Sequence, residues 1–251
     1  MKLPGLVGDV KRRLLVNYRI DPDVVAQLLP APFRPQLVNG FAVAGICLIR
    51  LGSMRPAGLP ARVGLTSENA AHRFAVEWDT ADGPQTGVYI PRRDSDSLIN
   101  VAVGGRLYPG VHHRARFDVA ETADEIRVAF AAVDASAAVS VVVRVTDELP
   151  DSRLFIDTAA ASAFFERGSI GFSDTRQASR FDGLELHTAA WKVEPGAVVS
   201  AESSFFADQA LFPAGSVELD CALVMRQIPV RWRALAPLRA PGTPHAQVGN
   251  P

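Results

Sequence analysis

The segment from Phe41 to Ile49 is apolar at every position and follows the turn signal Asn39-Gly40. A half-exposed strand or helix keeps one polar face, so a run without polar residues must be covered on both sides. The run is also much shorter than the roughly 20 apolar residues that cross a bilayer as a helix. It therefore predicts a central strand in a sheet that is packed on both faces.

Strand patterns also dominate the middle of the chain. Valine occupies every odd position from 139 to 145, whereas Ser140 and Arg144 take the opposite face, as in a strand with one buried side. Further strands are expected over Lys11–Tyr18, Ala71–Trp78, Gln85–Ile90, Arg114–Val119, Ile126–Ala131, Val198–Phe206, Val217–Leu223 and Ile228–Trp232. The predicted class is mainly β, with an α+β character from a few short helices.

Two helices are expected. Asp21 and Pro22 supply an N-cap and a first-turn proline for a helix that ends near Leu29, and Asp157 caps a second helix over Ala159–Arg167. The Pro- and Gly-rich stretch 54–64 is expected to be a loop. No linker divides the middle of the chain, so residues 1–236 are predicted to form one domain and residues 237–251, with four prolines, a flexible tail.

Composition excludes several classes of function. The 251 residues are 48% hydrophobic with a net charge of -1, enough for a stable core without a metal or disulfide and without a broad field for nucleic acid. The first residues lack the apolar core of a signal peptide, and no segment suits a membrane span. We therefore expect a cytoplasmic protein, with no nucleic-acid or membrane partner and with Cys47 and Cys221 reduced and buried.

Known cofactor and nucleophile motifs are absent from the sequence. It contains no GxGxxG, P-loop, HExxH, GxSxG or CxxC, so neither a cofactor nor a metal is expected. Polar residues instead concentrate between Glu68 and Arg116, a region that holds three of the five histidines.

Strand phase sorts these polar residues. His72 shares a face with Phe74, and His113 shares one with Phe117, so both histidines are inward candidates, whereas His112 is expected to be solvated. Arg92 and Arg93 lie just past a strand end, where a guanidinium can hold a ligand carboxylate. The structural alternatives are that His72 and His113 are hydrogen-bonded core residues and that the arginines lie in a surface turn.

Two segments suggest a family. The strand, Tyr-Arg pair, helix and Pro-x-Pro of Leu14–Phe33, and the Ala-Val-Gly and Tyr-Pro elements of Ala102–Gly110, resemble acetoacetate decarboxylase. From about residue 11 to 235, including Gly87–Asp94 and Leu219–Arg226, the chain is similar to a bacterial family of conserved proteins of unknown function in the same superfamily. The resemblance implies an antiparallel β-barrel with a few short helices around an interior cavity.

The same resemblance implies that the decarboxylase chemistry is lost. That chemistry needs a lysine amine to form an imine with the substrate ketone, but the lysine position falls on Gly110, and residues 12–191 contain no lysine. One active-site glutamate of the family falls on Ala42, and the other matches Glu68. Schiff-base decarboxylation is therefore not expected.

Three hypotheses remain open. The first is a barrel that binds a small carboxylate or carbonyl compound without turnover. The second is an enzyme of lyase or hydrolase type that uses general acid/base chemistry. The third is a homo-oligomeric interaction protein whose cavity is packed shut. The expected catalytic residues are Glu68 and His113, and the expected ligand-binding residues are His72, Tyr89, Arg92, Arg106 and Tyr108.

Overall fold

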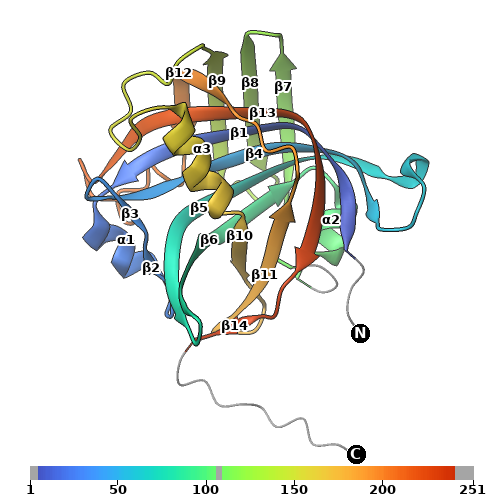
Figure 1. Cartoon of the computed structure of the whole chain (residues 1–251), viewed down its shortest axis with the longest axis horizontal. Helices are drawn as coiled ribbons and strands as arrows, with labels where there is room; N and C mark the ends of the chain where they lie inside the picture. Colours follow the sequence, from blue (N-terminus) through green and yellow to red (C-terminus); the bar gives the residue numbers. More distant parts are fainter. Residues whose placement is uncertain (1–4, 106–108, 241–251) are drawn as a thin grey trace, which may run out of the picture.

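The computed structural model describes residues 5–105 and 109–240, and its centre is a layer of long strands. The order across this layer is β13 (Val217–Ala234), β1 (Leu6–Ile20), β4 (Phe41–Pro56), β5 (Leu65–Thr80) and β6 (Gly83–Ser95), with every neighbouring pair antiparallel (Figure 1). We call these strands the shared layer, because two separate groups of strands connect its edges.

One group closes a smaller ring. The strand β10 (Ile170–Asp174) pairs in parallel with β6, and β11 (Arg180–His187) pairs antiparallel with both β10 and β13. The smaller ring therefore consists of the shared layer with β10 and β11, which lie below the shared layer in Figure 1.

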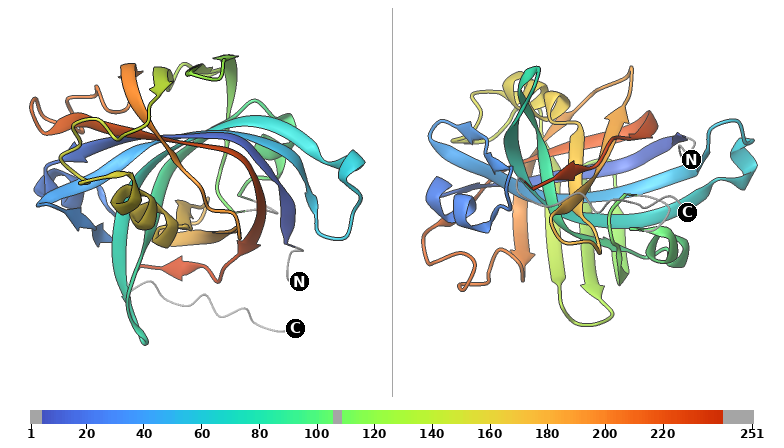
Figure 2. Two further views of the ribbon diagram at one scale, coloured as in Figure 1. Left: turned by 45° about the horizontal axis from the view of Figure 1, so that its top comes forward. Right: turned by 90° about the horizontal axis from the view of Figure 1, so that it is seen from below.

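A second group closes a larger ring on the other face of the shared layer. The strands β7 (His113–Glu121), β8 (Glu125–Ala132), β9 (Ala138–Val145) and β12 (Glu194–Ser203) connect β6 to β13. Only the β6–β7 step in this path is parallel. Figure 2 shows these strands extending away from the side that carries β10 and β11.

Short elements complete the chain. The helix α1 (Pro22–Leu28) begins at the Asp21 cap, and α3 (Thr158–Arg167) begins at the Asp157 cap, as the sequence predicts. The remaining elements are β2 (Arg34–Pro35), β3 (Leu37–Val38), the 3-10 turn η1 (Ala61–Val63), α2 (Leu98–Val103) and β14 (Leu238–Arg239). Within the described residues, none of the helices has the length and apolar character that a bilayer crossing requires.

The strand β4 confirms the prediction made from its apolar run. Its even-numbered side chains, among them Ala44 and Ile46, lie in the core of the larger ring. The odd-numbered side chains, among them Val43 and Cys47, lie in a second core with α3 on the smaller-ring side. Both faces of β4 are therefore packed, and the mainly β class with a few short helices is confirmed.

Several boundaries differ from the sequence predictions. Neither β10 nor β11 was predicted, because β10 is short and both contain glycine; a Cβ at Gly183 would lie 2.6 Å from the Phe172 ring. The two strands predicted between Val217 and Trp232 are one strand, which stays continuous through Gln227 at a φ of 53°. The predicted loop 54–64 is shorter because β4 continues to Pro56, and Leu238–Arg239, assigned to the tail, pair with β11.

Candidate functional site

The smaller ring contains a cavity of about 350 Å³ between the shared layer and β10 and β11. Most of its wall is apolar: Leu6, Ile49, Leu51, Met54, Leu65, Val88, Ile90, Ile99, Val103, Leu184, Leu186 and Trp232. The polar lining residues are Arg13, Cys47, Arg55, Ser67, Asn69, Arg73, Arg93, Asn100, His112 and Ser169. None of the described lining residues carries a carboxylate.

Three of the arginines converge from neighbouring strands, and we call Arg13, Arg73 and Arg93 the inner arginines. Arg13 of β1 donates from Nε to the Sγ of Cys47 on β4 at 3.2 Å. Arg73 lies on β5, two residues from Ala71, which pairs directly with Arg93 of β6. The guanidinium of Arg73 is also stacked 4.7 Å from the ring centroid of Phe165, so α3 covers this end of the cavity.

The inner arginines have no anionic partner within the described residues. Arg13 has two sulfur acceptors, Cys47 and, at 3.8 Å, Met225. The Nη2 of Arg73 donates to Asn17 Oδ1 at 2.6 Å, but its buried Nε has no partner. Arg93 donates from Nε to the Ser173 hydroxyl at 2.9 Å. Neutral acceptors do not cancel a positive charge, so this end of the cavity is cationic.

Burial lowers the pKa of Arg73 and of Arg93 to about 10 each. Both groups are therefore still charged at neutral pH. A lowered arginine pKa reports that the cation is poorly solvated where it stands, and an anion in the cavity would relieve that cost.

His112 lines the same cavity as a neutral imidazole. Its Nδ1 lies 3.1 Å from the carbonyl oxygen of Gly110, which can only accept, so Nδ1 carries the proton and Nε2 keeps its lone pair. Burial and the charge of Arg93 lower the pKa of His112 to about 4. The sequence predicted a solvated His112; instead the residue precedes β7 and turns toward the cavity.

Gly110 lies directly against Arg93. Its φ is +87°, a backbone conformation that disfavours side chains, and a Cβ there would lie 2.7 Å from Arg93 Nε. The arginine side chain thus fills the space beside the position at which the resemblance places a lysine. A lysine side chain at residue 110 would therefore need the space that the Arg93 side chain occupies in this structure.

A β-bulge decides which arginine enters the cavity. His72 pairs with Arg92 and Phe74 pairs with Tyr89, so β6 carries one extra residue between these pairs. The extra residue reverses the alternation, and Arg93 therefore lies on the cavity face while Arg92 lies on the opposite one. Arg92 forms a bidentate pair with the fully buried Asp94 at 2.7 and 2.8 Å and does not line the cavity.

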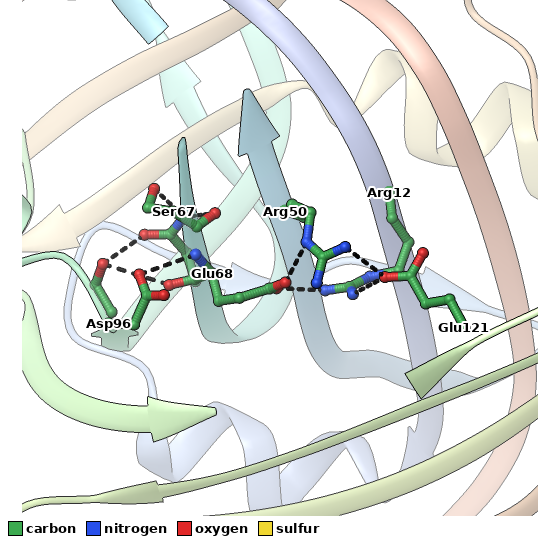
Figure 3. Close-up of polar contacts among 8 residues, drawn as sticks. Arg12, Arg50, Ser67, Glu68, Asp96 and Glu121 are labelled. Carbon is green, nitrogen blue, oxygen red and sulfur yellow. Dashed lines mark hydrogen bonds and ion pairs between the residues drawn. The ribbon is translucent and has the colours of Figure 1, made fainter. Parts of the chain in front are cut away.

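Glu68, an expected catalytic residue, lies on the larger-ring face of β5. Arg12 binds Glu68 at 2.6 Å and Glu121 of β7 at 2.5 Å, and Arg50 contacts the same two carboxylates (Figure 3). We call these four residues the paired cluster. Two cations balance two anions, and each carboxylate oxygen of Glu68 already accepts a hydrogen bond from an arginine.

The other expected site residues are also separate from the cavity. His113 lies 3.7 Å from Asp134 with a 41% exposed side chain. His72 is fully buried and contacts the Ser203 hydroxyl at 3.3 Å. The Tyr89 hydroxyl donates to Asp174, whose pKa is raised by burial. The structure therefore does not bring Glu68, His72 and His113 together as one donor set, and catalytic roles for Glu68 and His113 stay predictions.

Arg106 and Tyr108, two further expected ligand-binding residues, lie outside the described residues, as does Lys2. Of the remaining lysines, Lys11 lies 3.5 Å from Asp9 with a 39% exposed side chain, and Lys192 is exposed. Neither lines the cavity. Within the described residues, no three His, Cys, Asp or Glu side chains gather as metal ligands would.

The family of the chain follows from a match over residues 9–226 to DUF2071, described as an uncharacterized conserved protein. This match covers most of the 251 residues. The chain belongs to the DUF2071 family. The comparison with curated proteins gives no match.

Solved structures similar to this DUF2071 protein include the acetoacetate decarboxylase of Legionella pneumophila, at 12% identity over 94% of this chain and 88% of that chain, with a TM-score of 0.60. An acetoacetate decarboxylase-like enzyme from Sphingomonas wittichii RW1 matches at 15% identity over 94% and 91% of the chains, with a TM-score of 0.57. The enduracididine biosynthesis enzyme MppR, complexed with pyruvate, matches at 13% identity over 94% and 92%, also at 0.57. The fold is acetoacetate decarboxylase-like.

The sequence analysis of this DUF2071 chain missed Arg13 and Arg73, and of the neighbours Arg92 and Arg93 it chose Arg92 as the ligand-binding residue. Arg13 and Arg73 lie inside strands, on faces that mix apolar positions such as Leu15 and Ala71 with polar ones such as Asn17 and Asn69. The available signal was therefore weak: an arginine in the interior of a predicted strand, next to apolar positions on its own face. No local signal decided between Arg92 and Arg93, because the bulge in β6 sets the direction of both side chains.

Proposed function

We propose that this protein binds a small organic carboxylate in the cavity of the smaller ring, without forming a covalent imine. One observation carries the proposal: three guanidinium groups converge at one end of a mainly apolar cavity and, within the described residues, have neutral partners only. Arginine is the side chain best suited to bind a carboxylate through two parallel hydrogen bonds. The solved relative complexed with pyruvate supports a ligand of this kind.

The cavity also explains why a noncovalent role is favoured over decarboxylation through an imine. An imine requires a primary amine at the bound carbonyl, and the space beside Gly110 is filled by Arg93. Reduction with borohydride in the presence of acetoacetate or pyruvate should therefore leave the intact mass unchanged. A stoichiometric adduct on Lys2, Lys11 or Lys192 would refute the noncovalent proposal.

Binding is tested by calorimetry with a panel of carboxylates and the matching neutral amides. We expect carboxylates to bind and amides of the same shape to bind at least tenfold more weakly, because a charge-assisted hydrogen bond contributes about 1.5–3 kcal/mol. Arg93→Gln should weaken carboxylate binding by a similar factor. Arg127→Gln is the control, since Arg127 lies on β8 with a 62% exposed side chain. Equal binding of carboxylates and amides would contradict the proposal.

A second candidate function is general acid/base catalysis by His112. The observation that favours it is a neutral imidazole at the cavity wall with its Nδ1 proton held by Gly110, which leaves Nε2 as an acceptor for a ligand proton. Its pKa of about 4 makes it a weak base, so binding is the favoured function. Exchange of ligand α-protons in heavy water, lost in His112→Gln, would support catalysis; no exchange would leave binding alone.

A further inference from the structure

The cavity has a cationic inner end and a mainly apolar outer end, and its two walls on β4 and β5 show the gradient residue by residue. At the inner end Arg73 pairs with Gly45, and Ala71 pairs with Cys47. At the outer end Leu65 pairs with Met54. Arg73 and Leu65 are eight residues apart on one strand, or at most about 26 Å at 3.3 Å per residue.

Exposure shows which end opens to solvent. At the inner end Arg73 and Cys47 are buried, being 3% and 7% exposed, and Arg13 and Arg93 are half-buried. At the outer end Leu65 is 44% exposed, and Ile99 of α2 is 51% exposed. The mouth of the cavity is therefore mainly apolar. Its described cation, Arg55, is half-buried and donates to the carbonyl oxygens of Leu59 and Ser53, both at 2.8 Å. The inner arginines lie at the closed end beneath α3.

The polar groups on the wall between the two ends satisfy one another. Asn100 donates to Ser67 Oγ at 3.3 Å and to Asn69 Oδ1 at 3.1 Å, and Asn69 donates to Ser67 Oγ at 2.9 Å. These groups therefore require no polar atoms from a ligand in the middle of the cavity. Of the described lining cations, the three inner arginines converge without a carboxylate partner, whereas Arg55 lies apart from them at the mouth and donates to two backbone carbonyls.

We propose that the ligand of this cavity is a monocarboxylate with an unbranched aliphatic chain, rather than a short keto acid. This inference rests on the proposed function. The carboxylate binds the inner arginines, and the chain runs past Ile49 and Leu51 toward Leu65 and Ile99 at the mouth. A two- or three-carbon acid satisfies the arginines but leaves the apolar outer wall in water, whereas a longer chain buries that wall.

The test is calorimetric titration with acetate, butanoate, hexanoate, octanoate and decanoate, with pyruvate and acetoacetate beside them. Each buried methylene contributes about 0.8 kcal/mol, so we expect the affinity to rise about fourfold per methylene until the chain fills the cavity. The corresponding 1-alkanols and alkylamines should bind at least tenfold more weakly than the alkanoates, because the inner arginines attract only anions.

Variants at the mouth separate chain binding from carboxylate binding. Leu65→Ser and Ile99→Ser replace exposed side chains, so folding should be preserved, and each should weaken octanoate several-fold while leaving acetate unchanged. Val199→Ser is the matched control, because Val199 is 54% exposed on β12 and does not line the cavity. An equal effect of all three variants on octanoate would overturn the assigned direction of the chain.

A chemical footprint gives an independent readout. Cys47 lines the cavity, whereas Cys221 is 1% exposed and does not line it, and burial with the charge of Asp220 raises the pKa of Cys221 to about 12. Octanoate should slow alkylation of Cys47 by iodoacetamide without changing that of Cys221. If octanoate binds while Cys47 labelling is unchanged, the site lies elsewhere and the inference fails.

The outcomes distinguish the inference from the proposed function. Pyruvate or acetoacetate binding as tightly as octanoate, with protection of Cys47, would overturn the aliphatic ligand class and leave carboxylate binding intact. Failure of every carboxylate to bind would overturn both. An affinity that is independent of chain length would overturn the inference alone.

Discussion

Two groups of arginines lie on opposite faces of the shared layer and differ in what surrounds their charge. Arg12 and Arg13 are consecutive residues of β1, so their side chains point to opposite faces. Arg12 joins the paired cluster with Glu68 and Glu121, in the larger ring. Arg13 joins the inner arginines, which have no described carboxylate nearby, in the smaller ring.

The packing of the two rings differs in the same way. On the larger-ring face of the shared layer the core is filled by aromatic rings, with Phe205 4.8 Å from the His72 ring and Phe206 stacked 4.3 Å from Tyr18. The smaller ring keeps a cavity. A neutralised cluster next to a filled core is a structural arrangement, whereas unneutralised cations in a cavity are suited to a ligand.

The largest effect should come from breaking the paired cluster. Arg12→Met removes a 1% exposed guanidinium and leaves the buried carboxylate of Glu68 short of a partner, so we expect a loss of about 3–5 kcal/mol in the free energy of unfolding. Denaturant unfolding at neutral pH measures it.

The control is Arg50→Met, which should cost no more than about 1 kcal/mol because Arg50 has a 36% exposed side chain. Combining Arg12→Met with Glu68→Gln should recover part of the loss, since no unpaired charge then remains. A smaller loss for Arg12→Met than for Arg50→Met would show that the cluster is not the stabilising group.

The next expected effect is on the pH dependence of stability. It involves one histidine from each face of the shared layer, His72 on the larger-ring face and His112 at the cavity. Burial and nearby arginines lower the pKa of His72 to about 3 and that of His112 to about 4, against about 6.5 in an unfolded chain. Below pH 6.5 only the unfolded state takes up these protons, so stability falls as the pH falls, until each folded pKa is reached. The expected cost is about 1.4 kcal/mol per histidine for each pH unit below 6.5.

The protein loses unfolding free energy between pH 7 and pH 5, and this loss should be about 2 kcal/mol smaller in His72→Gln than in the wild type. In the absence of a ligand, His112→Gln should reduce the loss by a similar amount. A bound carboxylate should raise the pKa of His112 only, because His112 alone shares the cavity with the inner arginines. If both variants keep the wild-type dependence on pH, neither imidazole is neutral in the fold.

The fold was more accessible from the sequence than the site. The runs that form β4, β8 and β9 carry their own pattern, and the caps at Asp21 and Asp157 are local. In contrast, β10 and β11 pair with β6 and β13, far from them in sequence, so their five and eight residues show no pattern that decides between strand and loop.

The candidate site depends on which face each side chain takes. Strand phase correctly separated His72 from Arg73, but chemistry drew attention to the histidine, which lies in the filled core, and away from the arginine, which lies in the cavity. For Arg92 and Arg93 phase alone could not decide, because one extra residue in β6 reverses it. A bulge depends on pairing with β5, and a single sequence does not reveal that pairing.

The smallest expected effect on stability comes from removing one of the inner arginines. Arg93→Met keeps most of the side-chain volume and deletes a poorly solvated cation, so the free energy of unfolding should change by less than about 1 kcal/mol, in the stabilising direction. Its neighbour gives the sharpest control: Arg92→Met leaves the fully buried Asp94 unpaired and should destabilise as strongly as Arg12→Met. Octanoate should raise the melting temperature of Arg92→Met more than that of Arg93→Met, since stabilisation by a ligand follows its affinity for the folded state. A large loss of stability in Arg93→Met would mean that Arg93 is held by an anion of the protein itself, and the contrast between the two rings would then disappear.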